Sequence, residues 1–124
     1  PSKPSSNTTN GKAVLSREAL TYINQARAEK GRAPIKWASE LEGVALERAK
    51  EISTNFSHDG FYSRNLSGVA ENIAQLSPLN NSAKRVVNAW KESPAHYIAM
   101  TSSENTGAVI AKCDTYWVAL FTHY

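Results

Sequence analysis

The C-terminal stretch GAVIAKCDTYWVALFTHY, residues Gly107–Tyr124, decides the fold class of this chain. It holds two runs rich in valine, isoleucine and aromatic residues, which strands favour, and the polar pair Asp114-Thr115 separates them. We therefore predict a β-hairpin at this end of the sequence. Cys113 is the single cysteine of the chain, so no disulfide can form within it, and its place in the first strand predicts a small buried residue.

The segments before the hairpin have the spacing of helices. Residues 16–30 place apolar side chains on one face, with Ser16 as a candidate cap and Gly31 as the stop. A second helix is predicted to open at Ser39, where Glu42 would complete a capping box. Helices that come first and strands that come last predict an α+β layer fold.

Two further helices are expected nearer the hairpin. Ser82 begins one and Ser93-Pro94 begins a short one, because serine is a good N-cap and proline suits the first helical position. His96 then lies in the first turn of the short helix. Val69–Gln75, which carries Glu71, is predicted to be either a short helix or the start of a strand.

Composition and charge limit what the chain can be. Its 124 residues suit one domain, residues 13–124, after a start at residues 1–12 that is rich in proline, serine and asparagine and that we interpret as a flexible linker. The net charge of +3 is spread along the sequence without a basic block, so we expect no nucleic-acid partner. No apolar run approaches the roughly 20 residues that cross a bilayer, so we expect no transmembrane segment.

Four short segments in a fixed order carry the chemically informative residues. They are Phe56–Asp59 (FSHD), Val69–Ala74 (VAENIA), Ala89–His96 (AWKESPAH) and Tyr116–Phe121 (YWVALF). Each is a weak motif alone, but the ordered set resembles the CAP superfamily, named for cysteine-rich secretory proteins, antigen 5 and pathogenesis-related 1 proteins. The resemblance covers residues 14–124, and the pattern Trp-x-x-Ser-Pro-x-His resembles the bacterial branch of that family.

This resemblance implies a fold, a location and a class of partner. CAP domains are α–β–α sandwiches with a small antiparallel sheet in the middle, so we expect that fold over residues 13–124. A bacterial member would be secreted or tethered at the cell surface, and the linker would provide the tether. We expect a monomer that binds a lipid, glycan or protein ligand of the cell envelope or of a host.

His58, Glu71 and His96 are the candidate site residues. From the residues alone, His58 can simply interact with the end of a helix, and His96 can be a polar residue on an exposed turn. Glu71 lies in an apolar stretch, where a carboxylate is either paired with a donor such as Arg85 or orients a histidine. The resemblance implies that the three meet, because CAP domains gather two histidines and two acidic residues in one cleft.

The second acidic residue of such a cleft is expected three residues after Trp90, where this chain has Ser93. Glu92 comes one residue earlier, which is about 100° away around a helix, so we expect its side chain to point elsewhere. The resemblance therefore assigns His58, Glu71 and His96 to the cleft and leaves its second acidic position, at Ser93, without a carboxylate.

Two imidazoles beside a carboxylate suit zinc or another divalent metal, weakly bound by His58 and His96 with positions left open for water. We therefore expect a binding module whose cleft can hold such a metal. The alternative is a metal-dependent hydrolase of peptide or cell-envelope substrates, with His58, Glu71 and His96 as its catalytic residues. The incomplete acidic set favours the binding module, because acid–base catalysis needs two groups of different pKa. A structural or signalling domain with a vestigial site is a third option.

Overall fold

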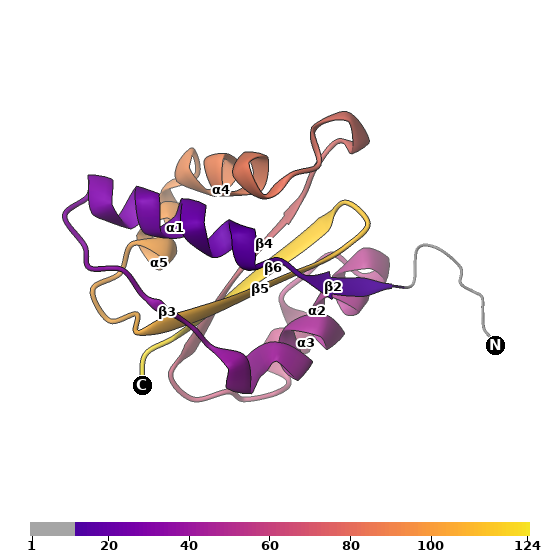
Figure 1. Ribbon diagram of the computed structural model, residues 1–124. Helices are drawn as coiled ribbons and strands as arrows, with labels where there is room; N and C mark the ends of the chain where they lie inside the picture. The colour runs from indigo at the N-terminus through magenta and orange to yellow at the C-terminus, as the bar shows by residue number, and fades with distance from the viewer. Residues whose placement is uncertain (1–11) are drawn as a thin grey trace.

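The computed structural model describes residues 12–124 and has helices on both sides of a sheet (Figure 1). The strands are β2 (Ala13–Leu15), β3 (Lys36–Trp37), β4 (Val69–Gln75), β5 (Gly107–Cys113) and β6 (Tyr116–Thr122). The α-helices are α1 (Arg17–Glu29), α2 (Glu42–Thr54), α3 (Asp59–Tyr62), α4 (Ala83–Lys91) and α5 (Pro94–Met100). The short 3₁₀ helices η2 (Ser39–Leu41) and η3 (Pro78–Asn80) lie in the connections.

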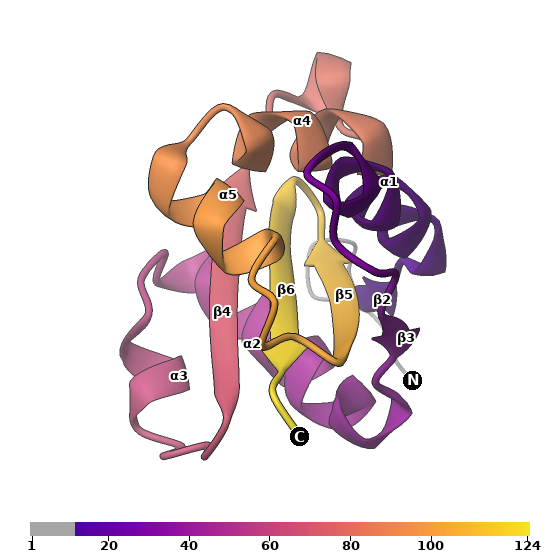
Figure 2. The ribbon, with the colours of Figure 1, turned by 90° about the vertical axis from the view of Figure 1, so that its left-hand side faces the viewer.

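These elements form three layers. Helices α1, α4 and α5 cover one face of the sheet, and α2 covers the other face with α3 beside it (Figures 1 and 2). The contacts agree with this view, because α1 packs on β5 and α5 on β4, whereas α2 packs on β2, β5 and β6. The predicted α+β class and the α–β–α sandwich are therefore confirmed.

The predicted hairpin forms the centre of the sheet. The strand order is β2-β5-β6-β4 with antiparallel neighbours throughout, and the two-residue β3 joins β5 in parallel. Pairing of β5 with β6 runs from Gly107 opposite Thr122 to Cys113 opposite Tyr116. Asp114 has a φ of 55°, the left-handed conformation that this tight turn needs and that aspartate tolerates better than most residues.

The predicted helices are present, but of the four serine residues predicted to cap them only Ser82 does so. The hydroxyl of Ser82 accepts a hydrogen bond of 3.1 Å from the backbone N–H of Arg85 at the start of α4. The side chains of Ser16 and Ser39 make no capping bond, so the predicted capping box between Ser39 and Glu42 is wrong. It fails because Ser39 is the first residue of η2, so that Leu41 and not Ser39 precedes the first turn of α2.

Val69–Gln75, for which the sequence left two options, is the edge strand β4. It pairs with β6 over its whole length. Its side chains alternate between the two faces: Glu71 bonds to a residue of α2, whereas the amide of Asn72 donates to the backbone carbonyl of His96 in α5. This alternation lets neighbouring residues of one strand contact both helical layers.

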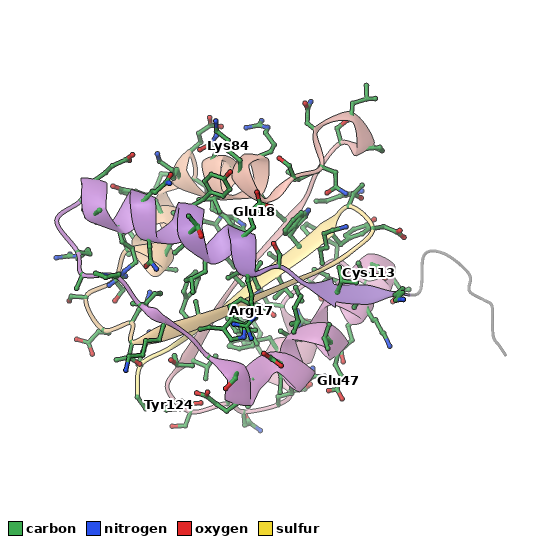
Figure 3. All side chains as sticks on the ribbon, in the orientation of Figure 1. Arg17, Glu18, Glu47, Lys84, Cys113 and Tyr124 are labelled. Atoms are coloured by element: carbon green, nitrogen blue, oxygen red, sulfur yellow. The ribbon has the colours of Figure 1, made fainter. Side chains whose placement is uncertain are left out.

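Two apolar clusters fill the space between the layers. One lies between the sheet and α1, α4 and α5, and it includes Trp90 and Trp117, which are 1% and 2% exposed. The other lies between the sheet and α2 and includes Cys113, at the end of β5 beside β2 (Figure 3). Cys113 is fully buried, as predicted, whereas Trp37 is only partly buried at the margin of both clusters.

Residues 1–11 lie outside the described part of the chain, so the flexible linker at residues 1–12 stays a prediction. Within residues 12–124, no helix combines the length and the apolar character that a membrane span requires.

The unequal use of the serine caps can be measured. Ser82→Ala should lower the free energy of unfolding by about 1 kcal/mol, because it removes the acceptor for a free N–H at the start of α4. Ser16→Ala, the matched change before α1, should cost less than about 0.5 kcal/mol because no capping bond is lost. Urea unfolding of both variants tests this difference, and equal losses would contradict it.

Candidate functional site

His58 lies just beyond the end of α2, at the position that precedes α3. Its Nδ1 is 2.8 Å from Oε1 of Glu71, so the imidazole is held by a carboxylate on the neighbouring strand β4. The His58 side chain is 36% exposed, whereas that of Glu71 is 1% exposed. The carboxylate is thus part of the interior, and the imidazole that it holds reaches the surface.

Glu71 is paired with Arg48 of α2, and both side chains are 1% exposed. Nε of Arg48 donates to Oε2 at 2.6 Å, and its Nη2 donates to Oε1 at 3.0 Å, which is a two-point contact between a planar fork and a carboxylate. The sequence had offered Arg85 as an example of the partner, and that assignment is wrong. The orienting role considered for Glu71 matches its contact with His58.

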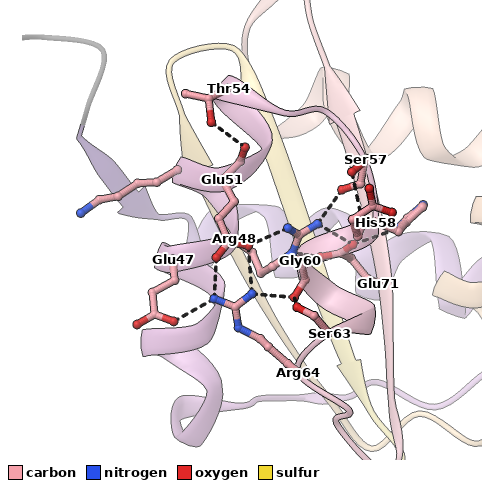
Figure 4. A network of polar contacts seen from close by, with 12 residues as sticks. Glu47, Arg48, Glu51, Thr54, Ser57, His58, Gly60, Ser63, Arg64 and Glu71 are labelled. Carbon is pink, nitrogen blue, oxygen red and sulfur yellow. Dashed lines mark hydrogen bonds and ion pairs between the residues drawn. The ribbon is translucent and has the colours of Figure 1, made fainter.

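Arg48 also fixes the chain next to His58. Its Nη2 donates to the backbone carbonyl of Ser57 at 2.8 Å, and its Nη1 donates to Oε1 of Glu51 at 2.8 Å (Figure 4). Burial by itself would lower the pKa of Arg48, but the hydrogen bonds to Glu71 and Glu51 outweigh burial and raise it. Arg48 therefore remains charged and positions His58 through both Glu71 and the preceding backbone.

A second arginine extends this group of charges towards the surface. Arg64 donates to both oxygens of Glu51, at 2.9 and 2.8 Å, and to Glu47 at 2.9 Å. The hydrogen bonds from Arg64, and then those from Arg48, lower the pKa of Glu51 to about 2. A methyl group at Gly60 would collide with the Glu51 carboxylate and would come within 2.6 Å of Nη1 of Arg48. Glycine therefore leaves the space that the ion pair between Arg48 and Glu51 occupies.

His96 is anchored by different chemistry. Its Nδ1 is 2.9 Å from the hydroxyl of Ser93, and its backbone carbonyl accepts the amide of Asn72 at 3.1 Å. Ser93 was predicted to cap α5, but its side chain makes no capping bond and holds the imidazole instead. Burial, and then the charge of His58, lower the pKa of His96, so it is neutral at pH 7.

The two histidines are thus attached to adjacent residues of β4. Glu71 holds the ring of His58, and Asn72 holds the backbone of His96. Each ring uses Nδ1 for its anchor, and within residues 12–124 neither Nε2 atom has a hydrogen-bond partner. The arrangement leaves two imidazole nitrogens for contact with another molecule.

Other side chains considered from the sequence do not join this pair. Glu92 is exposed at the end of α4, and in the described chain its carboxylate forms no hydrogen bond or ion pair. His123 is exposed near the last residue. Among the nearby tyrosines, Tyr62 has its ring centroid 5.8 Å from that of His58, whereas Tyr97 lies under the ammonium of Lys30.

Arg48 is the site residue that the sequence analysis missed. It follows Ala45 by three residues and precedes Ile52 by four, and both neighbours are fully buried. A charged residue at this spacing lies on the apolar face of its helix, where an ion needs a buried partner. From this interruption of the apolar face, the sequence could have predicted that Arg48 has a buried acidic partner. It could not have identified that partner as Glu71.

Comparisons with known proteins agree with this fold. The model of the family described as CAP, cysteine-rich secretory protein family, matches residues 20–122. A cysteine-rich secretory protein of Staphylococcus aureus has a TM-score of 0.69 at 18% identity, with 86% of this chain and 37% of that chain covered. An extracellular protein of Bacillus anthracis that contains an SCP domain has a TM-score of 0.74 at 18% identity, with 87% and 40% covered.

An outer surface protein of Borrelia burgdorferi is similar over nearly its full length. Its TM-score is 0.65 at 22% identity, with 90% of this chain and 97% of that chain covered. By contrast, this chain spans only about two fifths of the Staphylococcus and Bacillus proteins. The search of curated protein sequences finds no match. At these identities the solved structures establish the shared fold.

The buried pair of Arg48 and Glu71 should behave as one unit. Arg48→Met should lower the free energy of unfolding by about 3–5 kcal/mol, because it leaves an unpaired carboxylate in the interior. The double variant with Glu71→Met removes both charges and should be more stable than Arg48→Met alone. Urea unfolding of the wild type, both single variants and the double variant gives the coupling energy. If the losses in the free energy of unfolding of the two single variants add up to the loss in the double variant, the pairing is contradicted.

The low pKa of Glu51 predicts a loss of stability in acid. Its stabilising contribution is complete above the ordinary value of 4.5 and is lost as the pH falls towards about 2, because the unfolded chain takes up the proton first. Glu51→Gln should therefore be less stable than the wild type at pH 7, by no more than about 1 kcal/mol since this side chain is partly exposed. That gap should close between these two pH values.

The matched control for this pH profile is Glu40→Gln. Glu40 is exposed and, within residues 12–124, forms no hydrogen bond or ion pair. Thermal unfolding recorded from pH 7 to pH 2 should show a pH-dependent gap for Glu51→Gln alone. A gap for Glu51→Gln that stays constant down to pH 2 would rule out the lowered pKa.

Proposed function

The chain belongs to the CAP family, the cysteine-rich secretory protein family, and on that premise we propose that it is a secreted or surface-tethered binding module. In this proposal the ligand is recognised at His58 and His96, and the pair can hold a divalent metal. The module acts as a monomer, and its ligand is a lipid, glycan or protein of the cell envelope or of a host.

The location is supported by the proteins that share the fold. The names of three of them describe a secretory, an extracellular and an outer surface protein. A tether through the residues before β2 is compatible with the position of β2, because its first residue lies at the edge of the sheet away from β4 (Figure 2). The histidine pair, which is attached to β4, would then face away from the anchor.

The anchoring of the two imidazoles is the observation that carries the binding proposal. A ring whose Nδ1 is fixed by a hydrogen bond presents Nε2 in a defined direction, and metal-binding histidines are commonly held in this way. His58 is fixed by a carboxylate and His96 by a hydroxyl. The lowered pKa of His96 keeps its ring neutral at pH 7, which is the form that a metal or a ligand donor can use.

The described residues fit a metal only as an open site. Within residues 12–124 there is no cluster of three or more histidine, cysteine, aspartate or glutamate side chains that could hold a metal ion. Glu71 is already engaged by Arg48 and His58, so His58 and His96 would be the two protein ligands. Zinc bound there would supply open coordination positions for a ligand.

Glu71 also bears on the alternative, a metal-dependent hydrolase. A general base must be free to take a proton, but both Glu71 oxygens accept hydrogen bonds from Arg48. Ser93 stands where the resemblance would place a second acid. These side chains therefore support ligand binding better than they support acid–base catalysis. Hydrolytic activity is one of the results that the experiment below can give.

Calorimetric zinc titration at pH 7.5 tests the metal part of this proposal. The wild type should bind one zinc ion with an affinity in the micromolar range or weaker, because two nitrogens make a weak site. His58→Ala and His96→Ala should each abolish binding. Binding should also weaken at pH 6, since protons compete for the imidazoles.

His123→Ala is the matched control, because it removes the third histidine and leaves the pair intact. Zinc binding that survives His58→Ala and His96→Ala but is lost in His123→Ala would place the metal at the terminus and contradict the proposal. If the wild type does not bind zinc, the metal part fails, and screens of lipids and glycans with the same variants test the binding module. Peptide hydrolysis that depends on both histidines would favour the alternative.

A further inference from the structure

A pocket of about 480 Å³ lies where the end of α1 meets the loop that follows α5. Its wall includes Arg27, Arg32, Lys36, Ile35 and Asn105, and it includes neither histidine of the pair described above. No aspartate or glutamate is among the residues that line it. The pocket therefore combines three positive side chains with an apolar surface and no neutralising carboxylate.

Arg27 is the most deeply placed of these cations, with only 2% of its surface exposed. Its Nε donates to the carbonyl of Ala33 at 2.8 Å, and its Nη1 donates to the carbonyls of Met100 and Ser102 at 3.1 and 2.9 Å. Within residues 12–124, Nη2 has no partner, and it is not among the fully buried atoms that lack one. It therefore retains contact with solvent, which the pocket provides.

The same region keeps its positive charge unpaired. In the described chain, Arg27, Arg32 and Lys36 take part in no ion pair, although a buried arginine is usually paired. Burial, and then the charge of Arg32, lower the pKa of Arg27. An anion in the pocket would relieve both effects, because it would stabilise the charged guanidinium and screen the repulsion between the two arginines.

Asn105 joins the wall of the pocket to the end of α5. Its side-chain nitrogen donates to the carbonyl of Ala99 at 2.7 Å, which fixes the orientation of the amide. Its Oδ1 is then the single fully buried side-chain polar atom of residues 12–124 without a hydrogen-bond partner. Because this oxygen is fully buried, it is closed to a ligand in the pocket, and the three cations carry the anion site.

Arg27 and Arg32 also donate hydrogen bonds to backbone carbonyls, but these bonds do not occupy all of their N–H donors. Nε of Arg32 donates to the carbonyl of Thr101 at 2.8 Å, so both arginines hold carbonyls at the end of α5. These bonds account for Nε and Nη1 of Arg27 and for Nε of Arg32. Nη2 of Arg27 and both terminal nitrogens of Arg32 remain without partners in the described chain.

We propose that this pocket binds the oxyanion group, a phosphate or a carboxylate, of a small anionic ligand. Arg27 and Arg32 contact the oxyanion through their free terminal nitrogens, Lys36 adds charge at the rim, and Ile35 faces the apolar side of the ligand. Guanidinium groups suit this task because their planar donors match the oxygens of phosphate and carboxylate. The pocket is a second binding site, and it is independent of the histidine pair.

NMR titration of the ¹⁵N-labelled chain at constant ionic strength tests this site. The probes are inorganic phosphate, glucose 6-phosphate, glucuronate and uncharged glucose. The anions should shift the backbone amides of Arg32 and Asn105 and the Nε–H of Arg27, with saturation at millimolar concentrations, and glucose should shift none of them. The sugar anion that binds more tightly identifies the oxyanion as phosphate or carboxylate.

Variants decide whether the pocket itself is responsible. Lys36→Gln and Arg32→Gln should each weaken binding of the anions, by about tenfold for Arg32→Gln since it removes charge-assisted hydrogen bonds. Lys50→Gln, an exposed lysine of α2, is the control with the same change of charge and should leave affinity unchanged. Replacing Arg27 would also break three structural bonds, so the two rim variants carry the test.

Three results would overturn the proposal. Shifts that rise linearly without saturation would indicate an adventitious ion only. Equal weakening in Lys50→Gln and Lys36→Gln would indicate a general effect of net charge. Loss of anion binding in His58→Ala or His96→Ala would place the anion at the histidine pair. Unchanged binding in these histidine variants supports the separate pocket, whatever the zinc titration gives.

Discussion

The ion pair between Arg48 and Glu71 is the interaction on which the candidate site depends. It joins α2 to the edge strand β4 inside the protein, where both side chains are 1% exposed. The same two groups hold His58 and the carbonyl of Ser57, so the chain between α2 and α3 takes its position from them. A charge pair in an apolar setting is tolerated only when its remaining donors and acceptors are satisfied. Here Glu51 and the Ser57 carbonyl satisfy them, and this fixes the geometry of the site.

The two histidines are held by unlike partners, and this difference shapes what the site can do. A carboxylate holds His58, and a neutral hydroxyl holds His96. In the described chain, Glu71 is the charged group that bonds to the His58 ring, and Arg48 pairs with the same carboxylate. The lowered pKa of His96 keeps its ring available as a neutral donor. In the binding module that we propose, this neutral ring is one of the two groups that contact the ligand.

Arg48 and Arg27 illustrate two ways to bury an arginine in one small domain. Both interrupt the apolar face of a helix, and both are at most 2% exposed. Arg48 has two carboxylate partners, so its pKa is raised, whereas Arg27 has only backbone carbonyls and its pKa is lowered. Carbonyls satisfy donors but provide only partial charges, so Arg27 remains an incompletely neutralised cation. This contrast separates a closed structural network from the pocket that we propose binds an anion.

The sequence by itself determined the elements whose signals are local: the C-terminal hairpin, the helix that ends before Gly31 and the helix capped by Ser82. With the family resemblance it also indicated the three-layer fold and assigned His58, Glu71 and His96 as candidate site residues. Only the tertiary structure decided that residues 69–75 form a strand, that Ser93 holds His96 rather than a helix end, and that Arg48 is the partner of Glu71. The reason is physical. Helix spacing and turn chemistry act between neighbours in sequence, whereas a buried charge finds its partner 23 residues away, and only packing of α2 against the sheet brings the two together.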